Sequence, residues 1–394
     1  MDWKINVKQL QNCLLALAFF FSGANVLGLV FPFSITVLLI FLSLSMGREV
    51  QFHWMQLLIV FCTWIAAIFG FMFATEYSDL MANIRQISVV TVILLVVGSL
   101  QNEVEDVLEK YFIIFTFATG VGLVLYFLAP DFYLIEKSIG SRSYLIGPSS
   151  QTLDNGIVAF SALGPYRFEG FFDEPGTYSV FSAAASFWAY VRGRKLSFAI
   201  LIIATVFSES VVGLMVLTVL FIWRILLRSS SNLRLSVLAL MLFLFVWAQS
   251  VDIASFADDV TNKAAFLENK ALSGSTRFDQ LQSVVANWAN LTLPSGFSTT
   301  EVLKVADQSI TSGLLRAVIP FGLVLWAIAI MMLFVGLWRT NIYSASGVLF
   351  LALITSGLSR SSLLDLAIGW FVLLHILRKK EVICQHSLKT DSLF

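Results

Sequence analysis

Long apolar segments follow one another along the chain, and their length limits what it can fold into. A helix that crosses a bilayer needs about 17–25 mostly apolar residues. Twelve such segments make an all-α polytopic membrane protein the predicted fold. We predict the spans, several of them short, at 12–31, 34–47, 55–74, 86–100, 111–129, 175–191, 196–207, 211–227, 235–250, 314–338, 344–357 and 361–377.

Composition excludes the main alternatives. Apolar residues make up 58% of the chain and charged residues 13%, whereas a soluble domain carries about 45–50% and about 25%. So few charges do not cover the surface of a soluble protein of this size, which excludes a cytosolic enzyme. The 25 basic and 25 acidic residues balance, so the net charge gives no indication of nucleic acid, and we expect no such partner.

Basic residues indicate how the spans are oriented. With the N-terminus in the cytoplasm and twelve alternating spans, the cytoplasmic segments contain most short-loop basic residues, including Arg192, Arg194 and Lys195. The short outside loops contain only Arg85 and Arg360. This asymmetry follows the positive-inside rule. The sequence therefore predicts both termini in the cytoplasm, with the first apolar run a retained anchor.

Two long polar segments interrupt the apolar pattern, and both fall on the outside. The first covers 130–174 and the second 251–313, and loops of this length are usually functional. In the second loop, four apolar residues between 278 and 288 recur at helical spacing, so we expect it to be partly helical. We treat residues 1–394 as one membrane domain with two large extracytoplasmic loops.

Charged and aromatic residues are most concentrated where the first loop meets the next span, in YRFEGFFDEPG at 166–176. Pro175 suits the first turn of a helix, and Asp173 and Glu174 before it suit the positive end of the helix dipole. An acidic cap balanced by Arg167 is thus one interpretation. The other is a site in which the arginine binds a phosphate and a carboxylate activates a hydroxyl.

This segment resembles a motif of bacterial O-antigen and capsular polysaccharide polymerases (Wzy-type). Its RFEGFFDEPGTYS run is similar to their R-x-x-G-x-x-x-E-P-G-like segment. The SESVVG stretch at 208–213 resembles the S-x-S-x-x-G element of the same superfamily. SGSTR at 273–277, an amphipathic helix and the turn at 294–296 then follow in the order of that family, whose dozen spans and two outside loops this chain also resembles.

The resemblance implies a glycosyltransferase at the periplasmic face of the bacterial inner membrane. Such an enzyme transfers a growing glycan from an undecaprenyl diphosphate carrier onto the non-reducing end of a new lipid-linked repeat unit. The partners it implies are these lipid-linked oligosaccharides, a co-polymerase that regulates chain length, and a flippase. No cofactor is expected.

A lipid diphosphate as the leaving group requires fixed cations at the site. Arginine suits this role because its planar fork binds phosphate oxygens in bidentate fashion and stays charged. Arg167 and Arg277, one from each long loop, are the first candidates, with Arg142 and Arg360 in reserve. A salt bridge within its own loop is the alternative for each of them.

A general base would help the acceptor hydroxyl to react. All three histidines map to the cytoplasmic side, so carboxylates are the candidates, with Glu174 and Glu209 expected to act in catalysis. Glu209 lies either at membrane depth or in a solvated loop. The remaining residues of these motifs, expected to bind substrate, are Gly170, Asp173, Ser208, Ser210 and Asp279.

Metal binding has little support in the sequence. No HExxH, Cys/His cluster or DxD triplet occurs in the outside segments, and Asp258-Asp259 lacks the spacer of a DxD motif. The three cysteines show no metal-ligand spacing. We therefore expect a metal-independent enzyme.

Two other functions remain open. An O-antigen ligase, which moves finished glycan onto the lipid A core, belongs to the same superfamily, but related ligases carry an outside histidine that is missing here. A flippase for lipid-linked oligosaccharides would place charges along a central cavity. The predicted spans are nearly free of Asp, Glu, Lys and Arg, which favours chemistry at the outer face over translocation.

Cysteine labelling tests this orientation. Cysteines introduced at positions 150 and 265 should react with a membrane-impermeant reagent in intact cells, because both positions lie in the predicted outside loops. A cysteine at position 193 should not react. Labelling at 193 would overturn the orientation and, with it, the placement of the site.

Overall fold

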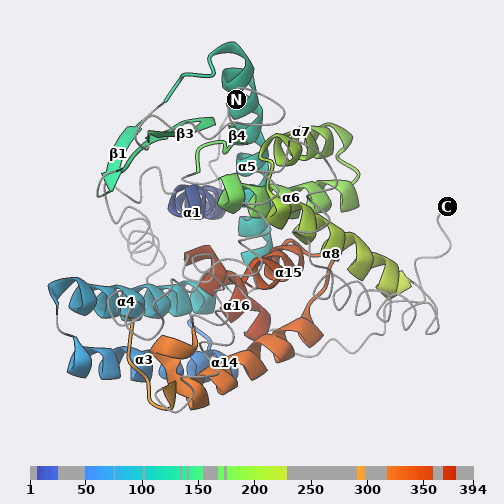
Figure 1. Cartoon of the computed structure of the whole chain (residues 1–394). Helices are drawn as coiled ribbons and strands as arrows, with labels where there is room; N and C mark the ends of the chain where they lie inside the picture. The colour runs from blue at the N-terminus through green and yellow to red at the C-terminus, as the bar shows by residue number, and fades with distance from the viewer. Residues whose placement is uncertain are drawn as a thin grey trace, which may run out of the picture.

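A computed structural model of the chain shows its architecture (Figure 1). It describes residues 7–24, 49–74, 76–100, 103–133, 135–139, 142–153, 167–172, 175–228, 291–297, 317–357 and 367–378. The helices are α1 (Val7–Ala24), α3 (Trp54–Phe73), α4 (Tyr77–Leu100), α5 (Val104–Leu128), α6 (Pro175–Val191), α7 (Lys195–Phe207), α8 (Val211–Arg228), α14 (Val318–Arg339), α15 (Ala345–Gly357) and α16 (Ala367–Arg378).

Four of these helices are long and apolar enough to cross a membrane: α3, α4, α5 and α14. The shorter α7, α8, α15 and α16 are also apolar. A helical protein that resides in a membrane is therefore supported. The predicted spans 34–47 and 235–250 lie outside the described residues, so the count of twelve stays a prediction.

Helix boundaries agree with the predicted spans where the apolar run and the helix end together. The span predicted at 175–191 coincides with α6. By contrast, α4 begins at Tyr77 instead of 86, and α5 at Val104 instead of 111. The added first turns carry Asp79, or Glu105 and Asp106. Acidic residues stabilise the N-terminus of a helix, so these helices extend beyond their apolar segments.

α6 forms the centre of one group of helices. Residues Pro175 to Ala189 are all buried, and α7, α8 and α15 pack against them. The Ser182 hydroxyl donates to the Leu201 carbonyl at 3.0 Å and accepts from Thr205 at 2.8 Å. Small and hydroxylated residues allow helices to approach closely and to hydrogen-bond where lipid supplies no water.

A second group is formed by α3, α4 and α14, and α15 and α16 lie between the two groups (Figure 1). The turn predicted at 294–296 joins this group: the Phe297 amide donates to the Asn83 side chain at 2.8 Å, and Ser295 and Gly296 donate to carbonyls at the start of α14. The helical path of α14 is interrupted at Gly322, whose φ is 63°. This part of the second loop therefore packs on helices.

The first loop contains a small antiparallel sheet, which the sequence did not predict, beside the predicted helices. Its strands, in spatial order, are β1 (Ile135–Ile139), β2 (Arg142–Ile146), β3 (Ser149–Leu153) and β4 (Arg167–Phe168). Short segments of alternating character around the Gly147-Pro148 turn were the available signal in the sequence. The sheet connects the loop to the helices, because β4 directly precedes α6.

The turn between α6 and α7 bears on the labelling experiment. Gly193 has a φ of 69°, a conformation that glycine adopts without strain and other residues rarely adopt. A cysteine at the exposed Lys195 is therefore a second probe of the same turn that leaves Gly193 in place.

Candidate functional site

The predicted motif residue Arg167 is held in place by β4. Its backbone pairs with Ser150 of β3, and its neighbour Phe168 is fully buried. The Phe168 ring packs edge-on against Tyr126 and Tyr178, with centroid distances of 5.5 and 5.1 Å. Aromatic pairs in this geometry attract each other beyond their buried area, so this short strand is anchored on α5 and α6.

The Arg167 side chain reaches the point where α7 ends. Its Nε donates to the Ser208 carbonyl and its Nη2 to the Glu209 carbonyl, both at 3.1 Å. The last carbonyls of a helix have no partner within the helix, and a cation there is favoured by the helix dipole. Arg167 thus joins the two predicted motifs, which lie 41 residues apart in the sequence.

The break between α7 and α8 has a strained backbone. Glu209 is half-buried and has a φ of 48°, and this left-handed conformation costs a non-glycine residue about 1–2 kcal/mol. Strain of this kind persists only where the surrounding structure enforces it, and it is concentrated at functional sites. The bonds from Arg167 to the carbonyls of Ser208 and of Glu209 itself provide that enforcement.

Two glycines bring the motifs into close contact. Gly170 has a φ of 61°, and a Cβ there would lie 2.9 Å from the Tyr178 ring. A Cβ at Gly213 would lie 2.6 Å from the Cβ of Ser179. Side chains at either glycine would push α6 away from its neighbours. The motif glycines therefore have a packing role.

The predicted serines also shape this break. Ser208 and Ser210 are buried, and the Ser208 hydroxyl donates to the Thr205 carbonyl at 2.6 Å. The Ser210 carbonyl accepts from the Leu214 amide in the first turn of α8. Substrate binding by Gly170, Ser208 and Ser210 stays a prediction.

Several predicted residues are not placed relative to this site. Arg142 begins β2, but its side chain lies outside the described atoms. The meeting of the two long loops thus stays a prediction. The other predicted residues outside the described part of the chain are Asp173, Glu174, Arg277, Asp279 and Arg360.

Glu169 is a candidate that the sequence analysis did not select. Only 3% of it is exposed, and its backbone bonds to Pro148 and Phe172 hold the turn that follows β4. Buried carboxylates are rare and mark functional sites in membrane proteins. The signal available in the sequence was its place two residues after Arg167, inside the motif.

No family model, curated protein or solved structure matches the chain. In the described residues, no three His, Cys, Asp or Glu side chains come together to hold a metal ion. What the structure defines is a helical membrane protein with an arginine fixed on a strained helix break.

Replacing Glu209 separates its backbone role from its side-chain role. Glu209→Gly removes the strain of the left-handed conformation and should increase the free energy of unfolding by about 1 kcal/mol. The measurement is a higher melting temperature in detergent. If the carboxylate also acts in the reaction, activity should fall in both Glu209→Gly and Glu209→Gln. Full activity in both variants would leave Glu209 a turn residue only.

Chelation tests the expected independence from metal. The sequence offers no metal-ligand cluster in its outside segments. The glycan-transfer activity expected of the purified protein should therefore persist in EDTA without added divalent ions. Complete loss in EDTA, restored by Mg²⁺ or Mn²⁺, would assign a metal to Asp258-Asp259 or Asp173-Glu174.

Proposed function

We propose that the chain is a polysaccharide polymerase of the O-antigen or capsule type. It would join undecaprenyl-diphosphate-linked repeat units at the periplasmic face of the bacterial inner membrane, as a metal-independent glycosyltransferase. The observation that carries this proposal is the pair of hydrogen bonds from Arg167 to the carbonyls of Ser208 and Glu209. These bonds unite the two segments that resemble the polymerase motifs.

The fixed geometry of Arg167 supports the role proposed for it. Hydrogen bonds to two successive carbonyls orient the plane of the guanidinium, so its charge is positioned before substrate arrives. A positioned charge stabilises a transition state without the cost of reorganisation. Arg167 would balance the charge that develops on the departing diphosphate, together with Arg277 from the second loop.

The reaction also needs a proton acceptor. As the acceptor hydroxyl attacks the anomeric carbon, the bond to the diphosphate oxygen breaks, and the hydroxyl proton passes to a carboxylate. Among the residues that the structure describes, Glu209 is the candidate proton acceptor, because it lies at the helix break that Arg167 contacts. Glu174 remains the second candidate, with Asp173 and Asp279 as substrate-binding groups.

The distribution of buried charge supports surface chemistry over a flippase. Within the described residues, the buried carboxylate and histidine side chains are Asp79, Glu169 and His375. Asp79 lies in the first turn of α4, and His375 in the last turn of α16, where it contacts Glu105 at 3.3 Å. Glu169 precedes α6. None of the three lies midway along a helix, where a charged translocation path would run.

Arginine variants in a deletion strain test the proposal. Lysine keeps the charge but loses the fork, so Arg167→Lys should reduce polymerisation, and Arg167→Ala should reduce it at least about tenfold, as expected for a lost bond to a charged group. The readout is the length of the polysaccharide ladder at matched protein abundance. Arg277→Lys and Arg277→Ala should behave in the same way.

Arg339 is the matched control. It also donates to a carbonyl near a helix end, that of Leu377, at 2.8 Å, but it lies in the last turn of α14, away from the two motifs. Arg339→Lys should leave the ladder intact. Full ladders from Arg167→Ala at normal abundance would refute the site. In the deletion strain, retained single-repeat caps indicate a polymerase, whereas loss of all repeats indicates a ligase or flippase.

A further inference from the structure

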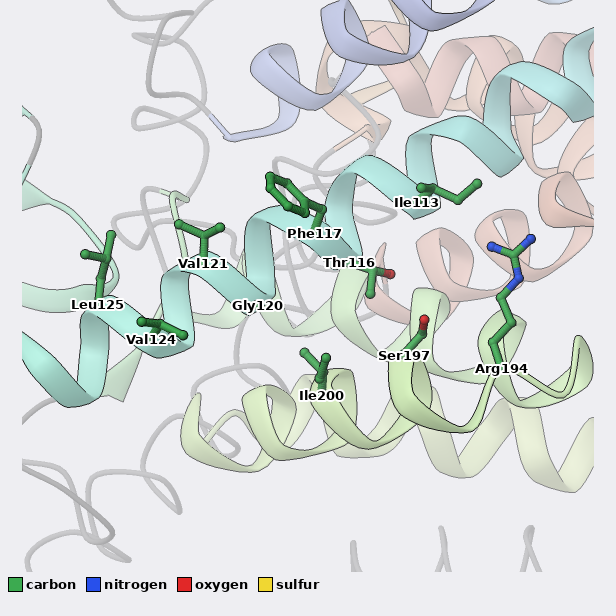
Figure 2. A pocket seen from close by; sticks show the side chains of 10 residues that line it. All are labelled: Ile113, Thr116, Phe117, Gly120, Val121, Val124, Leu125, Arg194, Ser197 and Ile200. Carbon is green, nitrogen blue, oxygen red and sulfur yellow. The ribbon is translucent and has the colours of Figure 1, made fainter.

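An apolar groove runs between α5 and α7, and no part of the proposed reaction uses it. Its volume is about 540 Å³. The lining residues include Phe117, Val121 and Val124 of α5 and Ser197 and Ile200 of α7. Figure 2 shows Val124 on the side of α5 that faces Ile200, Phe117 and Val121 on the other edge of α5, and Arg194 at one end. The groove is therefore apolar along its length and cationic at one end.

The groove is open to the surroundings of the protein. Phe117 is 75% exposed and Val124 56% exposed. A Cβ built on Gly120, in the middle of the groove, meets no atom within 4 Å. Because α5 is long and apolar enough to cross a membrane, this face has the character of a surface covered by acyl chains.

The cation at the end of the groove is held in place. The Arg194 guanidinium lies 4.6 Å from the centroid of the Trp188 ring, a distance typical of cation–π attraction. Lys195 follows it and is exposed. Arg192 in the same turn is paired with Glu109. Within the described residues, Arg194 and Lys195 have no such acidic partner.

The direction of the groove places this cation far from Arg167. Arg194 precedes α7, whereas Arg167 contacts its other end at Ser208. The helix has 13 residues, which corresponds to about 20 Å at 1.5 Å per residue. The cationic end therefore lies at the opposite end of α7 from the proposed active site, towards the side that the sequence predicts to be cytoplasmic.

We propose that this groove binds an anionic phospholipid from the leaflet at the Arg194 end. The phosphate lies on Arg194, and one acyl chain follows Phe117, Val121 and Val124 towards Leu125. Charge complementarity selects this occupant, because basic pockets between membrane helices bind anionic headgroups. A lipid entering with its headgroup at the Leu125 end would leave the cation without an anion.

Native mass spectrometry of the detergent-purified full chain tests the proposal. Phosphatidylglycerol and phosphatidylcholine with the same acyl chains are added, and the fraction of protein that retains each lipid is measured. Arg194→Gln should weaken phosphatidylglycerol retention about fivefold, as expected for one basic residue at about 1 kcal/mol. Phosphatidylcholine retention should not change.

Two further variants separate groove and charge. Gly120→Leu fills the groove and should weaken retention of both lipids, and Val124→Trp does so from an exposed position if Gly120→Leu fails to fold. Arg224→Gln is the charge control, because Arg224 lies 4.6 Å from the Tyr190 ring centroid in the same kind of contact but outside the groove lining. It should leave retention unchanged.

Three results would overturn the proposal. The first is equal retention of the two lipids by the wild-type protein, and the second is the same loss in Arg224→Gln as in Arg194→Gln. The third is that undecaprenyl phosphate displaces phosphatidylglycerol both from the wild-type protein and from Arg194→Gln. That result would assign the groove to the carrier lipid. Because retention is measured without polymerisation, the outcome is independent of the proposed function.

Discussion

Backbone carbonyls at a helix end need hydrogen-bond donors, and at a membrane this need constrains the structure because lipid offers none. At the end of α7, Arg167 meets it by donating to Ser208 and Glu209. Those bonds require β4 to lie against the helices, which the buried Phe168 ensures. The strained Glu209, the start of α8 and the position of the first loop all depend on this one contact.

The two ends of α7 carry different chemistry. At the Arg167 end, a guanidinium is fixed on the backbone carbonyls of Ser208 and Glu209, an arrangement suited to a charged transition state. At the Arg194 end, a guanidinium is fixed on the Trp188 ring at the mouth of an apolar groove, an arrangement suited to a lipid headgroup. One arginine is thus held by backbone carbonyls and the other by an aromatic face, at opposite ends of α7.

Sequence reasoning predicted the helices most accurately where hydropathy and hydrogen bonding end together, as in α6. It placed the starts of α4 and α5 too late because first turns with acidic residues continue these helices beyond the apolar run. It missed the sheet of the first loop because short strands carry weak local signals. At the site, it selected Arg167 and Glu209 from separate motifs and passed over Glu169, whose burial is visible only in three dimensions.

The sequence by itself determined a helical membrane protein. The length and apolar character of a segment are local properties, and they decide whether the segment is stable as a helix in a bilayer. Only the tertiary structure decided that Arg167 meets a helix break 41 residues away. It also decided that α5 and α7 leave a groove between them that ends at Arg194. Both features arise from how helices pack, which depends on side-chain shape across distant segments and leaves no periodic signal along the chain.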